Sequence, residues 1–185
     1  MRRLAAPLVA VLAAALLAGC DEGNWATKCT TAEGVVQCTP AQRTALKNDV
    51  TGELLDGGRY AISQDRGRVV VVNFWGSWCA PCRAEADDLE KTYQATKPEG
   101  VTFLGVNTRD DRDAAKAFER GYQVTYPSVY DVDGKVAVQF DVTQSSTPAT
   151  LIIDRQGRIA VAIRQATTVT QLRPLVDKIA AEGTG

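Results

Sequence analysis

The sequence predicts an α/β fold in which helices flank a central mixed β-sheet. The run Val69–Trp75 is apolar and rich in β-branched residues, which is typical of a central strand covered on both faces. Beyond it, strand-like and helix-like patterns alternate along the chain, first as strand, helix, strand, helix and then as two strands and a helix. This order of elements favours a layered α/β domain over an all-α or all-β one.

Each element of the first half follows from a local pattern. Short strands are predicted at residues 50–54 and 59–62 around the turn sequence Asp56-Gly57-Gly58, so an N-terminal β-hairpin should precede the central strand. A helical period starts at Cys79 and continues to Lys97, where a Pro-Glu-Gly sequence ends it.

The second half continues the alternation with shorter units. A second apolar strand is predicted at residues 101–106, and the helix after it, residues 110–122, has acidic residues in its first turn, where the helix dipole favours them. We expect a brief strand at 127–130, a short helix at 136–140, strands at 149–153 and 158–164, and a closing helix at 169–181.

The N-terminus has the features of an export signal. Arg2 and Arg3 precede an apolar run, residues 4–17, which is too short to span a bilayer, so residues 1–19 are predicted to be a signal peptide. The run ends in Leu17-Ala18-Gly19-Cys20, which resembles the lipobox of bacterial lipoproteins, and this resemblance implies lipidation of Cys20. A plain secretory signal with an incidental cysteine is the alternative.

Composition limits the chemistry of the mature chain. The 185 residues include five cysteines and no histidine, which excludes a Ser-His-Asp triad and any histidine-ligated metal centre. Without Arg2 and Arg3, 19 basic residues stand against 22 acidic ones, and this net charge of −3 argues against nucleic acid as a partner. We divide the rest into a polar tether with a small disulfide loop, residues 20–47, and one domain, residues 48–185.

Cys79 and Cys82 form a Cys-Ala-Pro-Cys motif where a strand changes to a helix. The unpaired N–H groups and the dipole of a helix N-terminus stabilise a thiolate on Cys79, whose sulfur we expect to be exposed and to attack first. Cys82, three residues on, is placed to resolve a mixed disulfide. A zinc site or an inert pair is the alternative, and the further ligands of a zinc site could only be Cys29 and Cys38.

Residues 72–83, which include the motif, resemble the active-site stretch of the thioredoxin superfamily, most closely its TlpA/ResA-like membrane-tethered thiol-disulfide oxidoreductases. The resemblance spans residues 48–182 and implies a thioredoxin-like fold. It also implies a cis peptide bond at Thr147-Pro148, where the N–H and C=O of Thr147 pair with a substrate strand. Trp78, Ala80 and Pro81 are the further substrate contacts that it implies.

Two features refine this resemblance. Thioredoxin has a buried aspartate before its motif, where this chain has Asn73, whereas ResA-like proteins use a glutamate three residues after the second cysteine, where this chain has Glu85. Glu85 is therefore a candidate for proton transfer to Cys82, although an acid near a helix N-terminus can also serve the dipole alone. The connection at residues 143–147 is about two residues longer and more polar than is usual in the family.

Cys29 and Cys38 enclose eight residues that include Gly34. Outside the cytoplasm, a structural disulfide is the expected fate of such a pair. A redox relay to Cys82 is the alternative.

The resemblance implies an extracytoplasmic enzyme that reduces protein disulfides, without a cofactor, on the outer face of the bacterial cytoplasmic membrane. Its partners would be a protein thiol or disulfide substrate, such as apocytochrome c in cytochrome c biogenesis, and a membrane thiol-electron donor. A disulfide-forming oxidant is the first alternative, because sequence does not set the reduction potential. A metal-binding lipoprotein is the second, although copper chaperones of this fold use a histidine that this chain lacks.

Overall fold

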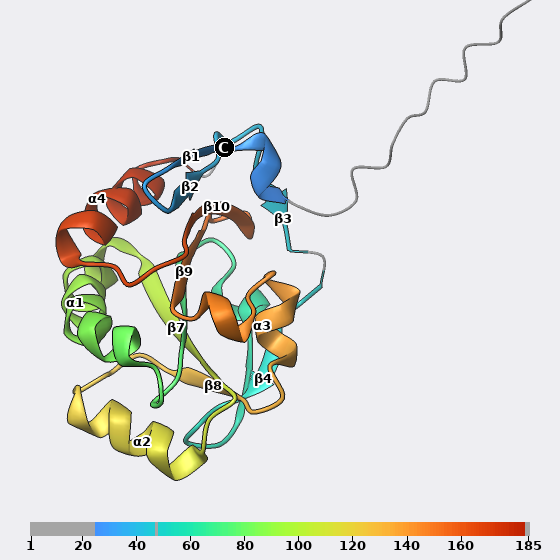
Figure 1. Cartoon of the computed structure of the whole chain (residues 1–185). Helices are drawn as coiled ribbons and strands as arrows, with labels where there is room; N and C mark the ends of the chain where they lie inside the picture. The colour runs from blue at the N-terminus through green and yellow to red at the C-terminus, as the bar shows by residue number, and fades with distance from the viewer. Residues whose placement is uncertain (1–24, 47, 184–185) are drawn as a thin grey trace, which may run out of the picture.

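The computed structural model describes residues 25–46 and 48–183 (Figure 1). The predicted signal peptide and Cys20 lie outside these described residues. Within the described part, no helix is both long and apolar enough to cross a membrane.

The core of the molecule is a mixed β-sheet with the strand order β1-β2-β10-β9-β6-β7-β8. The central strand β6 pairs in parallel with β7 and antiparallel with β9, which confirms the predicted mixed sheet. The strands of this sheet are β6 (Val69–Trp75), β7 (Val101–Thr108), β8 (Ser128–Asp131), β9 (Ala149–Ile153) and β10 (Arg158–Ile163). Three short strands extend it beyond β10: β1 (Thr30–Ala32), β2 (Val35–Gln37) and β3 (Thr44–Ala45), of which β2 and β3 pair with β10 itself.

Strand β6 is buried along its whole length, because both of its faces are covered. Val69 and Val71 pack in a cluster with α1 (Ala80–Thr96) and α4 (Val169–Ala180). Val70 and Val72 pack on the opposite face with α3 (Lys135–Gln139). Figure 1 shows α1 and α4 side by side, with α3 on the other side of the sheet. Covering on both faces explains why the sequence of β6 is apolar without alternation.

The predicted hairpin forms a separate two-stranded sheet of β4 (Thr51–Glu53) and β5 (Arg59–Ala61). Gly57 and Gly58 in its turn have φ values of 93° and 85°, a region that favours glycine. The hairpin is attached to the start of β8, where the N–H of Leu55 donates to the C=O of Ser128 (2.9 Å).

The first described segment differs from the sequence prediction of a tether and loop. Strands β1 and β2 form a hairpin, and β2 pairs with β10, so this segment extends the main sheet. The buried guanidinium of Arg43 donates to Asp154 (3.1 Å) and Glu182 (2.5 and 2.7 Å), which joins the segment to the β9–β10 turn and to the end of α4. Periodicity did not indicate these strands, because each has only three residues and β1 is exposed.

Helix α2 (Arg112–Gly121) begins two residues later than its predicted start at Asp110. Asp111 is the N-cap, and its carboxylate accepts hydrogen bonds from the N–H groups of Asp113 and Ala114 (3.0 Å each). Asp110 is therefore not part of the helix, and its carboxylate contacts the loop before Cys79 instead.

Candidate active site

The Cys79–Cys82 pair lies at the N-terminus of α1 and is joined by a disulfide. Cys79 is the N-cap residue, and its Sγ accepts a hydrogen bond from the N–H of Cys82 (3.2 Å). Pro81 stands in the first turn, where its missing N–H removes no helical hydrogen bond. This geometry places the N-terminal end of the helix dipole at Cys79 Sγ, where it stabilises negative charge on that sulfur in the reduced protein.

The expectation that Cys79 is exposed is wrong for the disulfide form. Cys79 is 3% exposed and Cys82 is 2% exposed, because both pack in a cluster with Leu55, Trp75 and Ala115. Exposure therefore does not distinguish the two cysteines. Their positions on the helix do, since only Cys79 caps it and receives the N–H of the other cysteine.

Glu85 is turned into the protein, and only 1% of it is exposed. Its Oε1 accepts a hydrogen bond from Asn73 Nδ2 and its Oε2 accepts one from the N–H of Thr167, each at 2.9 Å. Burial raises the pKa of Glu85 to about 7, against the opposite effect of these two hydrogen bonds. A carboxyl in this environment is not explained by the helix dipole alone, since a dipole acid can remain in solvent.

Pro148 follows a cis peptide bond from Thr147, as the resemblance implies. It is buried and directly precedes β9, whose Ala149 pairs with Phe74 near the end of β6. The N–H of Thr147 is already engaged, because it donates to the C=O of Gln144 (3.3 Å) in a short 3₁₀ helix, Gln144–Ser146. A substrate strand that paired with this N–H would have to replace that hydrogen bond.

Trp78, Ala80 and Pro81 form the exposed surface beside the cysteine pair. Trp78 is 42% exposed, yet its indole Nε1 donates to the C=O of Thr108 (3.3 Å). The indole also covers Gly76, where a Cβ would lie 2.4 Å from Nε1. Trp78 thus offers a solvent-facing aromatic surface in a fixed orientation.

The second disulfide joins Cys29 and Cys38. The N–H of Cys38 donates to the C=O of Ala160 in β10 (2.9 Å), which places Cys38 beside that strand. In the strand order β2-β10-β9-β6, this position beside β10 is three strand spacings from β6. Neighbouring strands lie about 4.8 Å apart, so the separation across the sheet is roughly 14 Å. Cys38 also packs in a different core cluster from Cys82, and each cysteine is bonded to its own partner. Disulfide exchange needs contact between sulfur atoms, so this placement argues against direct exchange with Cys82 in this conformation.

Comparison with known protein families identifies the group to which the chain belongs. Residues 41–162 match the model of the AhpC/TSA family. The chain belongs to the AhpC/TSA family. The matched range starts between β2 and β3 and ends within β10, so it includes the cysteine pair, Glu85 and Pro148.

Among relatives of this AhpC/TSA protein, the thiol-disulfide oxidoreductase ResA of Bacillus subtilis is 31% identical over 124 residues, which are 67% of this chain and 68% of the relative. A secreted thiol-disulfide isomerase from Corynebacterium glutamicum superposes with a TM-score of 0.77 at 32% identity, covering 81% of this chain and 93% of that one. A DsbF homologue from Corynebacterium diphtheriae gives 0.74 at 31% identity, covering 79% and 93%. The predicted fold and the thiol-disulfide oxidoreductase class are thereby confirmed.

Sequence reasoning missed two residues of the site, Ser77 and Asp110. Ser77 stands in the loop between β6 and α1, and Asp110 stands between β7 and α2. The acidic residues at 110 to 113 indicated only the start of a helix. No periodic pattern could show that one of these carboxylates turns away from the helix toward a loop 33 residues earlier in the chain.

Proposed function

We propose that this AhpC/TSA protein reduces protein disulfides outside the cytoplasm, with the Cys79–Cys82 pair as its redox centre. The observation that carries this proposal is the position of that pair, at the N-terminus of α1 beside the exposed Trp78, Ala80 and Pro81. The relative from Bacillus subtilis, a thiol-disulfide oxidoreductase, supports the reaction class.

The reaction proceeds in two exchanges. The Cys79 thiolate attacks one sulfur of the substrate disulfide, so that a Cys79–substrate bond forms and the second substrate sulfur leaves as a thiolate. Cys82 then gives up its proton and attacks Cys79 Sγ, which releases the first substrate sulfur. Two electrons have passed to the substrate, whose two thiolates take protons from solvent, and Cys79 and Cys82 are joined as a disulfide. A thiol-electron donor in the membrane returns the pair to its reduced state.

Glu85 is the proposed acceptor of the proton that leaves Cys82. It lies one helical turn after Cys82 on the buried side of α1, and its pKa of about 7 allows both protonation states near neutral pH. Asn73 holds one carboxylate oxygen and also donates to Thr150 Oγ1 (3.1 Å), which fixes the position of the acceptor.

We further propose that residues 1–19 direct export and that lipidated Cys20 holds the protein on the outer face of the cytoplasmic membrane. A tether that begins at residue 20 leads, through the Cys29–Cys38 structural disulfide and the strands that extend the sheet, into the redox domain, residues 48–185. Apocytochrome c, with its pair of haem-binding cysteines, is the proposed substrate. Two measurements test the anchor. Mass spectrometry of the mature protein should find a lipid on Cys20, and an unmodified Cys20 would contradict lipidation. Membrane fractionation should show that Cys20→Ala releases the protein from the membrane.

A disulfide-forming oxidant is the second candidate function. The hydrogen bond from the Cys82 N–H to Cys79 Sγ favours it, because stabilising the thiolate stabilises the reduced pair and raises the reduction potential. Equilibration of the pair with a glutathione buffer decides the direction. A reductase requires a value near that of thioredoxin, about −270 mV, whereas a value near about −120 mV, typical of a strong oxidant, would contradict reduction.

A further inference from the structure

Asp110 is an almost buried carboxylate that both proposed exchanges leave without a role. It is 9% exposed and stands between the end of β7 and the N-cap of α2. Its Oδ2 accepts hydrogen bonds from the N–H of Ser77 (2.5 Å) and from Asn107 Nδ2 (2.8 Å). Its Oδ1 accepts from Ser77 Oγ (2.7 Å) and from the N–H of Asp111 (2.9 Å). Both oxygens therefore contact Ser77.

Helix capping does not explain this arrangement. Asp111 caps α2 through the N–H groups of Asp113 and Ala114, so the helix start does not depend on the carboxylate of Asp110. Two of the four hydrogen bonds to Asp110 come instead from one residue of the loop that leads into Cys79.

That loop, residues 76–78, has two more attachments of its own. The indole of Trp78 donates to the C=O of Thr108 (3.3 Å), and the Arg83 guanidinium donates to the C=O of Ser77 (2.7 Å). The N–H of Cys79 donates to the C=O of Gly76 (3.1 Å), which continues the turn into the helix. The attachments of Ser77 and Trp78 thus fix the chain on the N-terminal side of the nucleophilic sulfur.

We propose that Asp110 is a positioning residue that acts through Ser77 to hold Cys79 and Trp78 for attack on a disulfide. Disulfide exchange requires the attacking sulfur to approach one particular sulfur of its target, so its rate depends on how well the attacking side chain is oriented. A carboxylate that takes both donors of Ser77 restricts the loop that sets this orientation. The inference rests on the proposed exchange activity and deepens it.

The test measures the second-order rate constant for oxidation of the reduced protein by glutathione disulfide, which yields the Cys79–Cys82 disulfide and two glutathione thiols. We expect Asp110→Asn to slow this reaction at least tenfold, because its new amide cannot accept from two of the four donors. Ser77→Ala should slow it about threefold, since the N–H of residue 77 remains. The double variant should be no slower than Asp110→Asn alone, because both changes remove the same contact.

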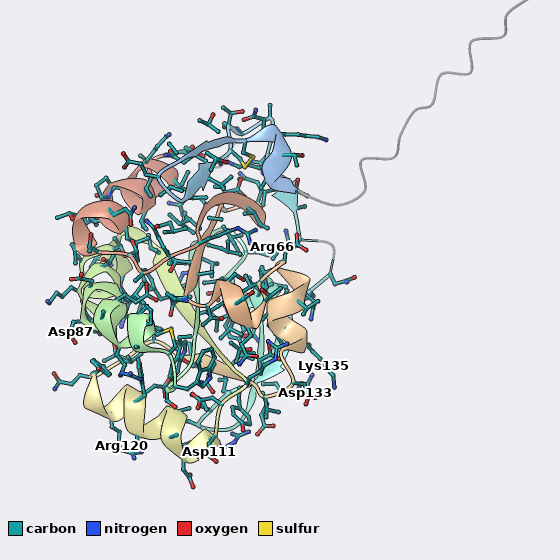
Figure 2. All side chains as sticks on the ribbon, in the orientation of Figure 1. Arg66, Asp87, Asp111, Arg120, Asp133 and Lys135 are labelled. Carbon is teal, nitrogen blue, oxygen red and sulfur yellow. A yellow bond between two sulfur atoms is a disulfide. The ribbon has the colours of Figure 1, made fainter. Side chains whose placement is uncertain are left out.

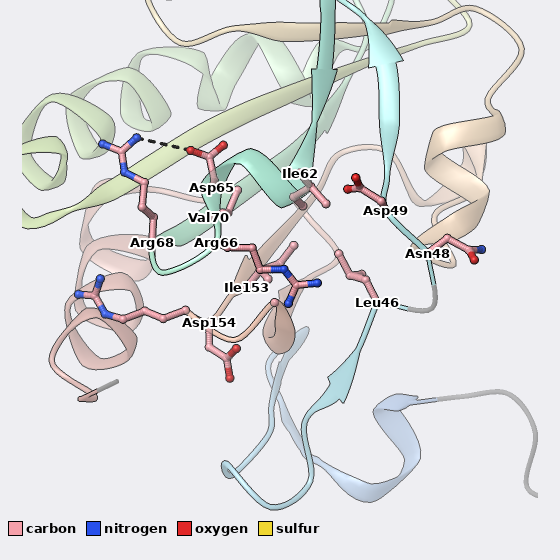
Figure 3. A pocket seen from close by; sticks show the side chains of 12 residues that line it. Leu46, Asn48, Asp49, Ile62, Asp65, Arg66, Arg68, Val70, Ile153 and Asp154 are labelled. Atoms are coloured by element: carbon pink, nitrogen blue, oxygen red, sulfur yellow. Dashed lines mark hydrogen bonds and ion pairs between the residues drawn. The ribbon is translucent and has the colours of Figure 1, made fainter. Parts of the chain in front are cut away.

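Asp154→Asn is the matched control. Asp154 is 3% exposed and also accepts several hydrogen bonds, from Arg43, Gln156 and Arg158, but it follows β9 at the opposite end of the sheet from the cysteines. Figure 3 shows it beside a pocket with Arg66 and Ile153, and Figure 2 shows Arg66 far from Asp111, the neighbour of Asp110. Asp154→Asn should lower stability without slowing exchange in the folded protein.

An Asp110→Asn rate within twofold of the wild-type rate would overturn the inference, and so would equal slowing by Asp154→Asn, which would show a general effect of lost stability. If Asp110→Asn fails to fold, the rate of Ser77→Ala is compared with that of Asp154→Asn instead. An unchanged Ser77→Ala rate then overturns the inference. An inactive wild-type protein would instead refute the proposed function and, with it, the activity that Asp110 serves.

Discussion

Glu85→Gln should change the pH dependence of stability, because the carboxyl it replaces is buried with a raised pKa. The new amide can keep both contacts. Its oxygen accepts from the N–H of Thr167, and Asn73 can turn its own amide so that its oxygen accepts from the new NH₂ group. The substitution therefore removes the ionisation of residue 85 with little change in packing.

The sign follows from proton binding. The pKa of Glu85 is about 7 in the folded protein, against 4.5 as its ordinary value, so between these pH values the folded state binds more protons than the unfolded state. Stability contributed by this residue is complete below about pH 4.5 and is lost as pH rises to about 7. A difference of 2.5 pKa units corresponds to about 3 kcal/mol of stability. Solvent screens little of this free energy, because the side chain is almost fully buried.

Urea unfolding of the oxidised wild-type protein and of Glu85→Gln, from about pH 4 to about pH 8, measures this effect. The other titrating groups are common to both proteins and cancel in the difference between their free energies of unfolding. That difference should shift by about 3 kcal/mol in favour of the variant as pH rises. A difference that stays constant across this range would refute the assignment of a raised pKa to Glu85.

Three further variants test other parts of the structure. Cys82→Ser should trap the substrate protein as a stable mixed disulfide on non-reducing gels, since the resolving thiol is gone, and a variant that traps nothing would contradict the proposed order of attack. Replacing Cys29 and Cys38 with serine should lower the free energy of unfolding by about 2.5 kcal/mol in chemical denaturation and leave insulin reduction unchanged, whereas lost activity would support a relay. Arg43→Ala should lower the free energy of unfolding by about 3 kcal/mol, because the buried carboxylate of Asp154 loses the positive charge of Arg43. An unchanged urea midpoint would contradict this.

The elements that sequence predicted well have strong local patterns. The β-branched run of β6, apolar except at Asn73, and the helical period after Cys79 were sufficient to place the redox pair between a strand and a helix, and the structure has both elements there. Glu85 could be proposed from the resemblance to ResA-like proteins, which have a glutamate three residues after the second cysteine. Its burial against Thr167 could not, since that contact joins residues 82 positions apart.

The features that sequence did not show depend on long-range contacts. Strand β2 exists because it pairs with β10, and three residues of its own sequence are too few for a pattern. The turn of Asp110 toward Ser77 likewise depends on how β7 and β6 end side by side. The burial of Cys79 follows from packing with Leu55 of the hairpin connection, which local sequence around the motif does not contain.

Reduction of insulin disulfides, with dithiothreitol as the electron donor, tests the central role of Cys79 most directly. The wild-type protein should accelerate the precipitation of the insulin B chain well above the rate with dithiothreitol alone. Cys79→Ala should remove that acceleration, because Cys82 lacks the N-cap position that stabilises a thiolate on Cys79. Acceleration that survives in Cys79→Ala would contradict the assignment of Cys79 as the attacking thiol.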